Sequence, residues 1–285
     1  MNMPLPSVMT ALMKTSVWIN GLLIPGRSAA KVLQRYCRPV CFFNEGSEYE
    51  LSSAGSCLLF RYRRRCMAFF AKHQLGKENA AREAREFCII VDDGGDGKIA
   101  LTPNAVASPR YHLPEHGFGE DVQFVEYETQ RGSRDLAPHF LDLDLDSRPD
   151  LRSVAKDQLM AVFTIGYPTG FISYDIAFDE EFLPQDVSVT HRFSKLILSN
   201  DWTEGMELHL TLRQHEKYPE TIKDLDGFSG SPVFFFYKEE DHQVQLGFAG
   251  MVRLGGNGVV HLYEAAQIKR LLDHLFPRSS QNSSV

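Results

Sequence analysis

The sequence predicts an all-β fold made of two antiparallel β-barrels and a C-terminal helix. Short runs rich in β-branched and aromatic residues recur along most of the chain, separated by glycine, proline and asparagine. This pattern is typical of antiparallel strands joined by turns. Residues 264–275 instead carry apolar side chains at helical spacing, and Pro277 ends that pattern. We therefore expect an N-terminal extension over 1–37, a first barrel over 38–152, a second barrel with its closing helix over 153–277, and a disordered tail over 278–285.

The first barrel is expected to contain six strands. A hairpin turn over Asp93–Gly97 separates two of them, and it lacks the later ligands and closing glutamate of a calcium loop. Residues 76–85 have the composition of a helix, and 103–119 that of a loop. The strands are predicted near 38–44, 56–61, 66–71, 86–92, 98–103 and 122–128.

The second barrel is expected to begin with the apolar run 161–165, which leads into a Gly-Tyr-Pro turn at 166–168. The closing helix would follow its last strand. Further strands are predicted near 191–198, 207–212, 233–237, 244–253 and 259–262.

Composition and charge narrow the class of protein. Hydrophobic residues make up 43% of the chain and charged residues 24%, which is ordinary for a globular protein. The net charge of −7 does not favour nucleic acid as a partner, because such binding needs a basic face. The one basic cluster, Arg61 with 63–65, lies between two apolar runs, as a solvated hairpin turn would. No apolar run approaches the ~20 residues needed to span a bilayer, so no membrane partner is expected.

Cysteine usage predicts a cytoplasmic protein. The five cysteines all lie in the first third of the chain, and their odd number does not suit a secreted disulfide framework. We expect reduced, buried thiols. Cys37 and Cys41 have a spacing loosely like a zinc clip, but no second pair follows. The apolar run 17–24 could instead belong to a signal peptide, although Asn20, Gly21 and Pro25 interrupt it. We expect this N-terminal segment to pack on the body.

The segment 226–233 is the strongest candidate for chemistry. Its sequence Asp-Gly-Phe-Ser-Gly-Ser-Pro-Val places Ser229 between glycines and just before a strand. This arrangement suits a nucleophile on a tight turn. The backbone N–H groups of Gly227 and Ser229 would then converge into an oxyanion hole. A structural hairpin is the alternative, since glycine–serine turns are common in β proteins.

A base and an acid are available upstream of Ser229. His73 follows the buried apolar run 66–71, and Asp135 precedes Leu136-Ala137. The three residues occur in the order histidine, aspartate, serine, which is the order of the chymotrypsin-like peptidases. Asp142, Asp144 and Asp146 are rival acids, and we prefer Asp135 to them.

Five segments carry the resemblance to the trypsin-like, chymotrypsin-fold serine peptidases. It covers about residues 38–275 and is closest to the divergent intracellular bacterial kind. Residues 55–60 resemble the strand that opens the first barrel, 71–73 the histidine segment, 135–137 the aspartate segment, 227–232 the serine motif and 247–252 the strand beside the substrate pocket.

The resemblance implies a serine endopeptidase with the triad His73, Asp135 and Ser229 and no metal or cofactor. Its substrate would be a protein or peptide, and the resemblance also allows an activating protein partner. Phe228 departs from the family pattern, in which a polar residue usually precedes the serine. In the digestive members of the family that residue is an aspartate, which pairs with a freshly cut N-terminus. Activation by that route is therefore not expected here.

The resemblance also implies a pocket for the residue before the cut. Cationic side chains there would favour an acidic residue, whereas if they point to solvent the apolar ones would favour an apolar residue. An inactive, peptide-binding relative and a hydrolase of small esters are the alternatives to an endopeptidase. The expected pocket residues are Lys223, Gly250, Met251, Arg253 and Leu254.

Overall fold

The protein is described by a computed structural model that covers most of the chain. The described residues are 14–43, 51–75, 87–92, 97–107, 121–181, 184–204, 210–217, 225–239 and 243–277. The helix expected over 76–85, most of the turn expected over 93–97, the tail over 278–285 and the pocket residue Lys223 lie outside them. No helix among the described residues is long and apolar enough to span a membrane.

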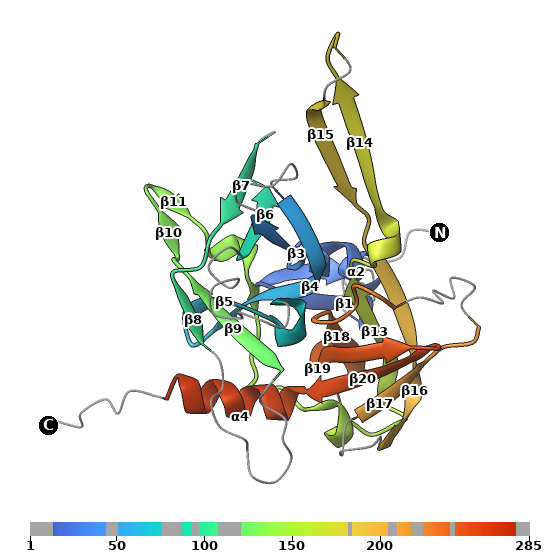
Figure 1. The fold of residues 1–285 in the computed structure, drawn as a ribbon. Coiled ribbons are helices and arrows are strands. Elements are labelled where there is room, and N and C mark those ends of the chain that lie inside the picture. Colours follow the sequence, from blue (N-terminus) through green and yellow to red (C-terminus); the bar gives the residue numbers. More distant parts are fainter. Residues whose placement is uncertain are drawn as a thin grey trace, which may run out of the picture.

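The all-β class with a C-terminal helix is confirmed (Figure 1). A curved eight-stranded sheet forms the first half, in the order β7-β6-β3-β4-β5-β9-β8 with the short β12 pairing β4 in parallel. The strands are β3 (Cys37–Phe43), β4 (Leu51–Tyr62), β5 (Arg65–Ala71), β6 (Phe87–Asp92), β7 (Lys98–Leu101), β8 (Ala105–Ala107), β9 (Val122–Tyr127) and β12 (Leu141–Asp142). In the described part of the chain this sheet does not close, because β7 and β8 do not pair with each other.

The second half forms a closed barrel in the order β13-β16-β17-β20-β19-β18. Strand β16 alternates between buried and more exposed side chains, whereas β13, β18 and β19 are buried over most of their length. Buried side chains of this half form one core cluster that includes Phe228. The strands are β13 (Leu159–Gly166), β16 (Ser194–Glu204), β17 (Leu210–Gln214), β18 (Pro232–Lys238), β19 (Val244–Gly256) and β20 (Val259–Glu264), and the helix α4 (Ala265–Leu275) follows them.

Several elements differ from the expectation. The N-terminal segment contains a hairpin, β1 (Ser16–Ile19) with β2 (Leu22–Pro25), and a helix α2 (Gly26–Leu33). Val17, Ile19 and Leu33 are buried in a core cluster that also holds residues of both sheets and α4. The region expected as a loop contains β8, because Ala105–Ala107 extends the sheet beside β9.

A second unexpected hairpin, β14 (Ile172–Phe178) with β15 (Pro184–His191), projects from the body (Figure 1). Four 3-10 turns, η1 (Lys72–Leu75), η2 (Ala137–His139), η3 (Leu151–Ser153) and η4 (Thr169–Phe171), and the short hairpin of β10 (Gln130–Arg131) with β11 (Arg134–Asp135) complete the described elements.

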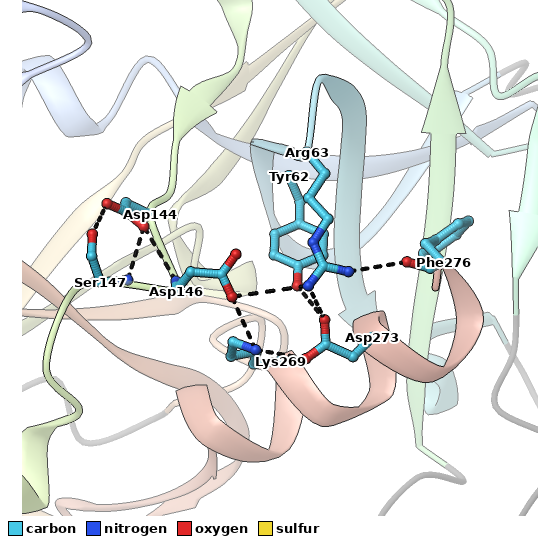
Figure 2. A network of polar contacts seen from close by, with 8 residues as sticks. All are labelled: Tyr62, Arg63, Asp144, Asp146, Ser147, Lys269, Asp273 and Phe276. Carbon is cyan, nitrogen blue, oxygen red and sulfur yellow. Dashed lines mark hydrogen bonds and ion pairs between the residues drawn. The ribbon is translucent and has the colours of Figure 1, made fainter. Parts of the chain in front are cut away.

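Ion pairs hold α4 against the first sheet (Figure 2). Asp273 of α4 accepts a hydrogen bond from the Tyr62 hydroxyl at 2.6 Å and one from the Arg63 guanidinium. Lys269 lies 2.6 Å from Asp273 and 3.0 Å from Asp146 of the segment that joins the two sheets. Burial acts to raise the pKa of Asp273, but hydrogen bonds from Lys269 and Tyr62 and the positive charges of Arg63 and Lys269 outweigh it and lower this pKa to about 2.

A cavity of about 730 Å³ lies beside these ion pairs and away from Ser229. Trp18 of the N-terminal hairpin, Leu143 and Leu145 of the joining segment and Lys269 of α4 contribute to its lining. Asp142 pairs with Arg61 at 2.9 Å, and Asp144 accepts a hydrogen bond from the backbone N–H of Ser147 at 3.0 Å. All three rival acids of the joining segment therefore have structural partners here and do not contact His73.

Candidate active site

His73 faces a carboxylate, but that carboxylate is Asp121 and not Asp135. The Nδ1 atom of His73 lies 3.0 and 2.9 Å from the two carboxylate oxygens of Asp121, and the backbone N–H of His73 donates to the same group at 2.8 Å. A carboxylate only accepts hydrogen bonds, so Nδ1 carries the proton and Nε2 is left as the basic nitrogen. The histidine side chain is half-exposed, whereas that of Asp121 is mostly covered.

Strand pairing explains this contact. Ala71, the last residue of β5, pairs with Val122, the first residue of β9. One residue further, the backbone N–H of Lys72 donates to the carbonyl of Asp121 at 2.7 Å. The turn η1 then carries His73 over the start of β9, where the Asp121 side chain meets it.

Asp135 was therefore the wrong choice of partner for His73. It lies on the exposed β10–β11 hairpin, at the side of the first sheet away from the second barrel (Figure 1). Its carboxylate accepts a hydrogen bond from the backbone N–H of Ala137 at 2.9 Å, as a turn residue does. The sequence does contain a signal for Asp121, since this aspartate directly precedes the apolar strand 122–127.

Ser229 lies on the predicted tight turn. Gly227 has a φ of 88° and Gly230 a φ of 81°, values that favour glycine. A Cβ atom at Gly227 would lie 2.4 Å from the carbonyl oxygen of Tyr167, so the turn also needs glycine for the close approach of the chain after β13. Within the described residues, the backbone N–H groups of Gly227 and Ser229 have no hydrogen-bond acceptor. They are therefore available as oxyanion donors.

The hydroxyl of Ser229 points to the backbone. Its Oγ donates to the carbonyl of Arg253 on β19 at 3.3 Å, and no described contact joins it to His73. Catalytic hydrogen bonds are often long or poorly aligned when no substrate is bound, and they tighten in the complex with substrate.

Two residues that the sequence analysis did not single out join the histidine and serine segments. The Ser56 hydroxyl on β4 donates to the carbonyl of Gly227 at 2.7 Å and accepts from the backbone N–H of Tyr167 at 2.8 Å. Its backbone N–H donates to the carbonyl of Ser229 at 3.1 Å. Gln74, the residue after His73, donates from Nε2 to that same carbonyl at 2.6 Å. The first sheet therefore holds the serine turn of the second barrel at several points.

Phe228 is an internal anchor for the turn. Its ring is fully buried in the core of the second barrel. A Cβ atom at Gly166 would lie 2.8 Å from its Cδ1 atom, so a glycine at the end of β13 makes room for the ring. Phe228 thus contributes apolar packing directly before Ser229.

The expected pocket residues separate into two groups. Met251 is fully buried in the core and Gly250, with a φ of 144°, lies against the carbonyl of Tyr263, so both are structural here. The placement of Met251 as a pocket wall is therefore wrong. Leu254 is exposed, and the guanidinium of Arg253 lies 5.7 Å from the centre of the Tyr263 ring. Both residues come directly after Val252 in the chain, and the carbonyl oxygen of Val252 accepts a hydrogen bond from the backbone N–H of Gly230 at 2.8 Å.

All five cysteines are free and buried in the first sheet and its surroundings. Burial raises the pKa of Cys41 to about 12 and that of Cys66 and Cys88 to about 11, and it also raises that of Cys37 and Cys57. Thiols with such pKa values contribute little thiolate at neutral pH. They are packing residues and not nucleophiles.

Comparison with known proteins adds a likeness in fold. No family model and no curated protein matches the chain. Among the solved structures that resemble it at low sequence identity are one titled "Human heparin binding protein" (TM-score 0.48, 11% identity) and one titled "Atomic resolution structure of HBP" (TM-score 0.47, 10% identity). In each case the match covers 88% of this chain and 95% of the other. The fold itself is given by the closed six-stranded barrel, the open eight-stranded sheet and the C-terminal helix described above, and the comparisons say nothing of activity.

Proposed function

We propose that this protein is a serine endopeptidase of trypsin-like fold. The observation that carries the proposal is the pairing of His73 with Asp121 next to a glycine-flanked serine turn. Ser229 Oγ would attack the carbonyl carbon of a peptide bond while Nε2 of His73 takes its proton. His73 would then give that proton to the leaving amine. Asp121 holds the imidazole in the required tautomer and stabilises its charged form.

The turn that carries Ser229 would also supply the hydrogen-bond donors that stabilise the oxyanion. The N–H groups of Gly227 and Ser229 would stabilise the negative charge that develops on the carbonyl oxygen. None of these steps calls on a metal or cofactor. The substrate would be a protein or peptide, and the buried cysteines suit a reducing, cytoplasmic setting. Because Phe228 offers no charge to a new N-terminus, switching by a partner protein is the form of activation that we favour.

A fluorophosphonate probe tests the proposal directly, since it labels only an activated serine. We expect one label on Ser229 in the full-length chain. Ser229→Ala and His73→Ala should each lose essentially all of the labelling, and the double variant should lose little more, because the residues act as a unit. Ser231→Ala is the matched control, since that serine is fully buried two residues away. Label that persists in Ser229→Ala or is lost in Ser231→Ala alone would contradict the assignment.

One observation favours a second candidate, an inactive peptide-binding relative. The Ser229 hydroxyl is bonded to the Arg253 carbonyl and not to His73. If wild-type protein shows no labelling under any condition while a peptide library still yields binders that compete with one another, this second candidate replaces the first.

A further inference from the structure

The amide of Gln74 lies in a closely fitted space between the two halves of the molecule. Its Nε2 donates to the carbonyl of Ser229 at 2.6 Å and lies 3.4 Å from the carbonyl of Ser56. Two glycines make room for it. A Cβ atom at Gly55 would lie 2.1 Å from this nitrogen, and one at Gly230 would lie 3.3 Å from it. Both glycines have positive φ, 111° and 81°, so the backbone on both sides is shaped around the amide.

The hydrogen bond from Gln74 is accepted by Ser229, the proposed nucleophile. Ser229 would contribute both the nucleophilic oxygen and one oxyanion N–H. Its carbonyl accepts hydrogen bonds from Gln74 Nε2 and from the backbone N–H of Ser56. Gln74 follows His73 directly in η1. A shift of the Gln74 amide would therefore change the distance between base and nucleophile, which lie on different sheets.

We propose that Gln74 is a positioning residue that holds the Ser229 backbone at a fixed place relative to His73. The inference rests on the proposed peptidase function, because only catalysis needs that placement. Gln74 does not touch the substrate or the reacting atoms. It acts through the carbonyl of Ser229, and it shares this acceptor with the Ser56 N–H. A misplacement of about 1 Å at such a site can cost about a hundredfold in rate.

Two variants separate positioning from general stability. Gln74→Met keeps the length of the side chain and removes the donor. Gln74→Glu keeps its shape but turns a carboxylate toward two carbonyl oxygens. Gln245→Met is the matched control, because the Gln245 amide is also largely buried and bonded, to Arg148 and Glu239, at a place without contact to the serine turn.

The measurement is the rate of modification by an alkyl fluorophosphonate, resolved into the binding constant and the maximal rate. For Gln74→Met we expect the maximal rate to fall about tenfold to a hundredfold, with the binding constant unchanged within about twofold. Gln245→Met should leave both constants within about twofold of wild type. A Gln74→Met protein that folds and reacts at the wild-type maximal rate overturns the inference and leaves the proposed function intact.

The pH profile of Gln74→Glu gives a second readout. When its carboxyl is protonated, the O–H can donate to the Ser229 carbonyl as the amide did. The rate relative to wild type at the same pH should therefore rise as the pH falls. A ratio independent of pH contradicts the inference, and this variant carries the test if Gln74→Met does not fold.

If wild type does not react with the probe, the proposed function has failed and amide hydrogen exchange decides the role of Gln74. Exchange over residues 225–231 and at Ser56 should then be faster in Gln74→Met than in wild type and Gln245→Met. Unchanged exchange there would show that the amide does not hold the turn.

Discussion

Asparagine in place of Asp121 should remove most of the reactivity of Ser229 and leave the fold intact. The Asp121 carboxylate accepts from the His73 backbone N–H at 2.8 Å and from Nδ1 at 2.9 and 3.0 Å. The amide oxygen of an asparagine can keep the backbone bond, but its NH₂ group then faces Nδ1. The imidazole must accept there and carry its proton on Nε2. In that tautomer it cannot take the proton of Ser229.

The expected loss follows from this tautomer. The same substitution at the matching position of a chymotrypsin-type enzyme lowers kcat by about 10⁴, which corresponds to about 5.4 kcal/mol of activation free energy. Hydrolysis of a peptide found by library screening, or the fluorophosphonate rate, measures the loss. The thermal midpoint by circular dichroism shows whether the fold is kept.

Asp135→Asn is the matched control for this experiment. It makes the same chemical change on the first sheet, and its side-chain oxygen can still accept from the Ala137 N–H. We expect its rate within about twofold of wild type, in line with a surface substitution. A 10⁴-fold loss in Asp135→Asn or Asp142→Asn, with Asp121→Asn near wild type, would refute the assignment of the acid.

Two further predictions concern stability. Phe228→Ala should lower the free energy of unfolding by about 3–5 kcal/mol, because it opens a cavity in the second core; urea denaturation measures this, and the exposed Phe171→Ala should change it by less than about 0.5 kcal/mol. Asp273→Asn should destabilise the protein at neutral pH and progressively less in acid. The folded pKa of Asp273, about 2, lies below its unfolded value, so its contribution is complete above about pH 4 and is lost as the pH falls toward 2. Thermal midpoints of both proteins from pH 7 to 2 test this, and a difference that grows in acid would contradict it.

The strand pattern of the body was predictable because its information is local. Alternation of apolar and polar residues marks β16, and continuous apolar runs mark β5 and β18. The turn at Ser229 was equally local, since Gly227 and Gly230 supply the positive φ that it needs. The β14–β15 hairpin was missed because it pairs only with itself among the described strands and follows no core pattern.

The acid of the site could not be chosen from local pattern. Asp121 and Asp135 both precede apolar residues, and only the register of β5 against β9 shows which one meets His73. That register depends on pairing between segments about 50 residues apart, as for His73 and Asp121 with a separation of 48. The resemblance of residues 135–137 to the aspartate segment carries no information about the register of β5 against β9.

The hydrogen bonds that join the two halves of the molecule could not be predicted from the sequence, for a different reason. Ser56 and Gln74 are common polar residues, and their partners in the serine turn are backbone carbonyls, which any residue offers. Those partners lie 171 and 155 residues away along the chain. The base belongs to one sheet and the nucleophile to the other, so their relative position is set by these few bonds and by the shared core cluster. Packing of apolar side chains tolerates small shifts, whereas a hydrogen bond at 2.6 Å to the nucleophile's own carbonyl does not. The precision that proton transfer requires is therefore concentrated at Ser56 and Gln74, and substitutions there should affect rate more than stability.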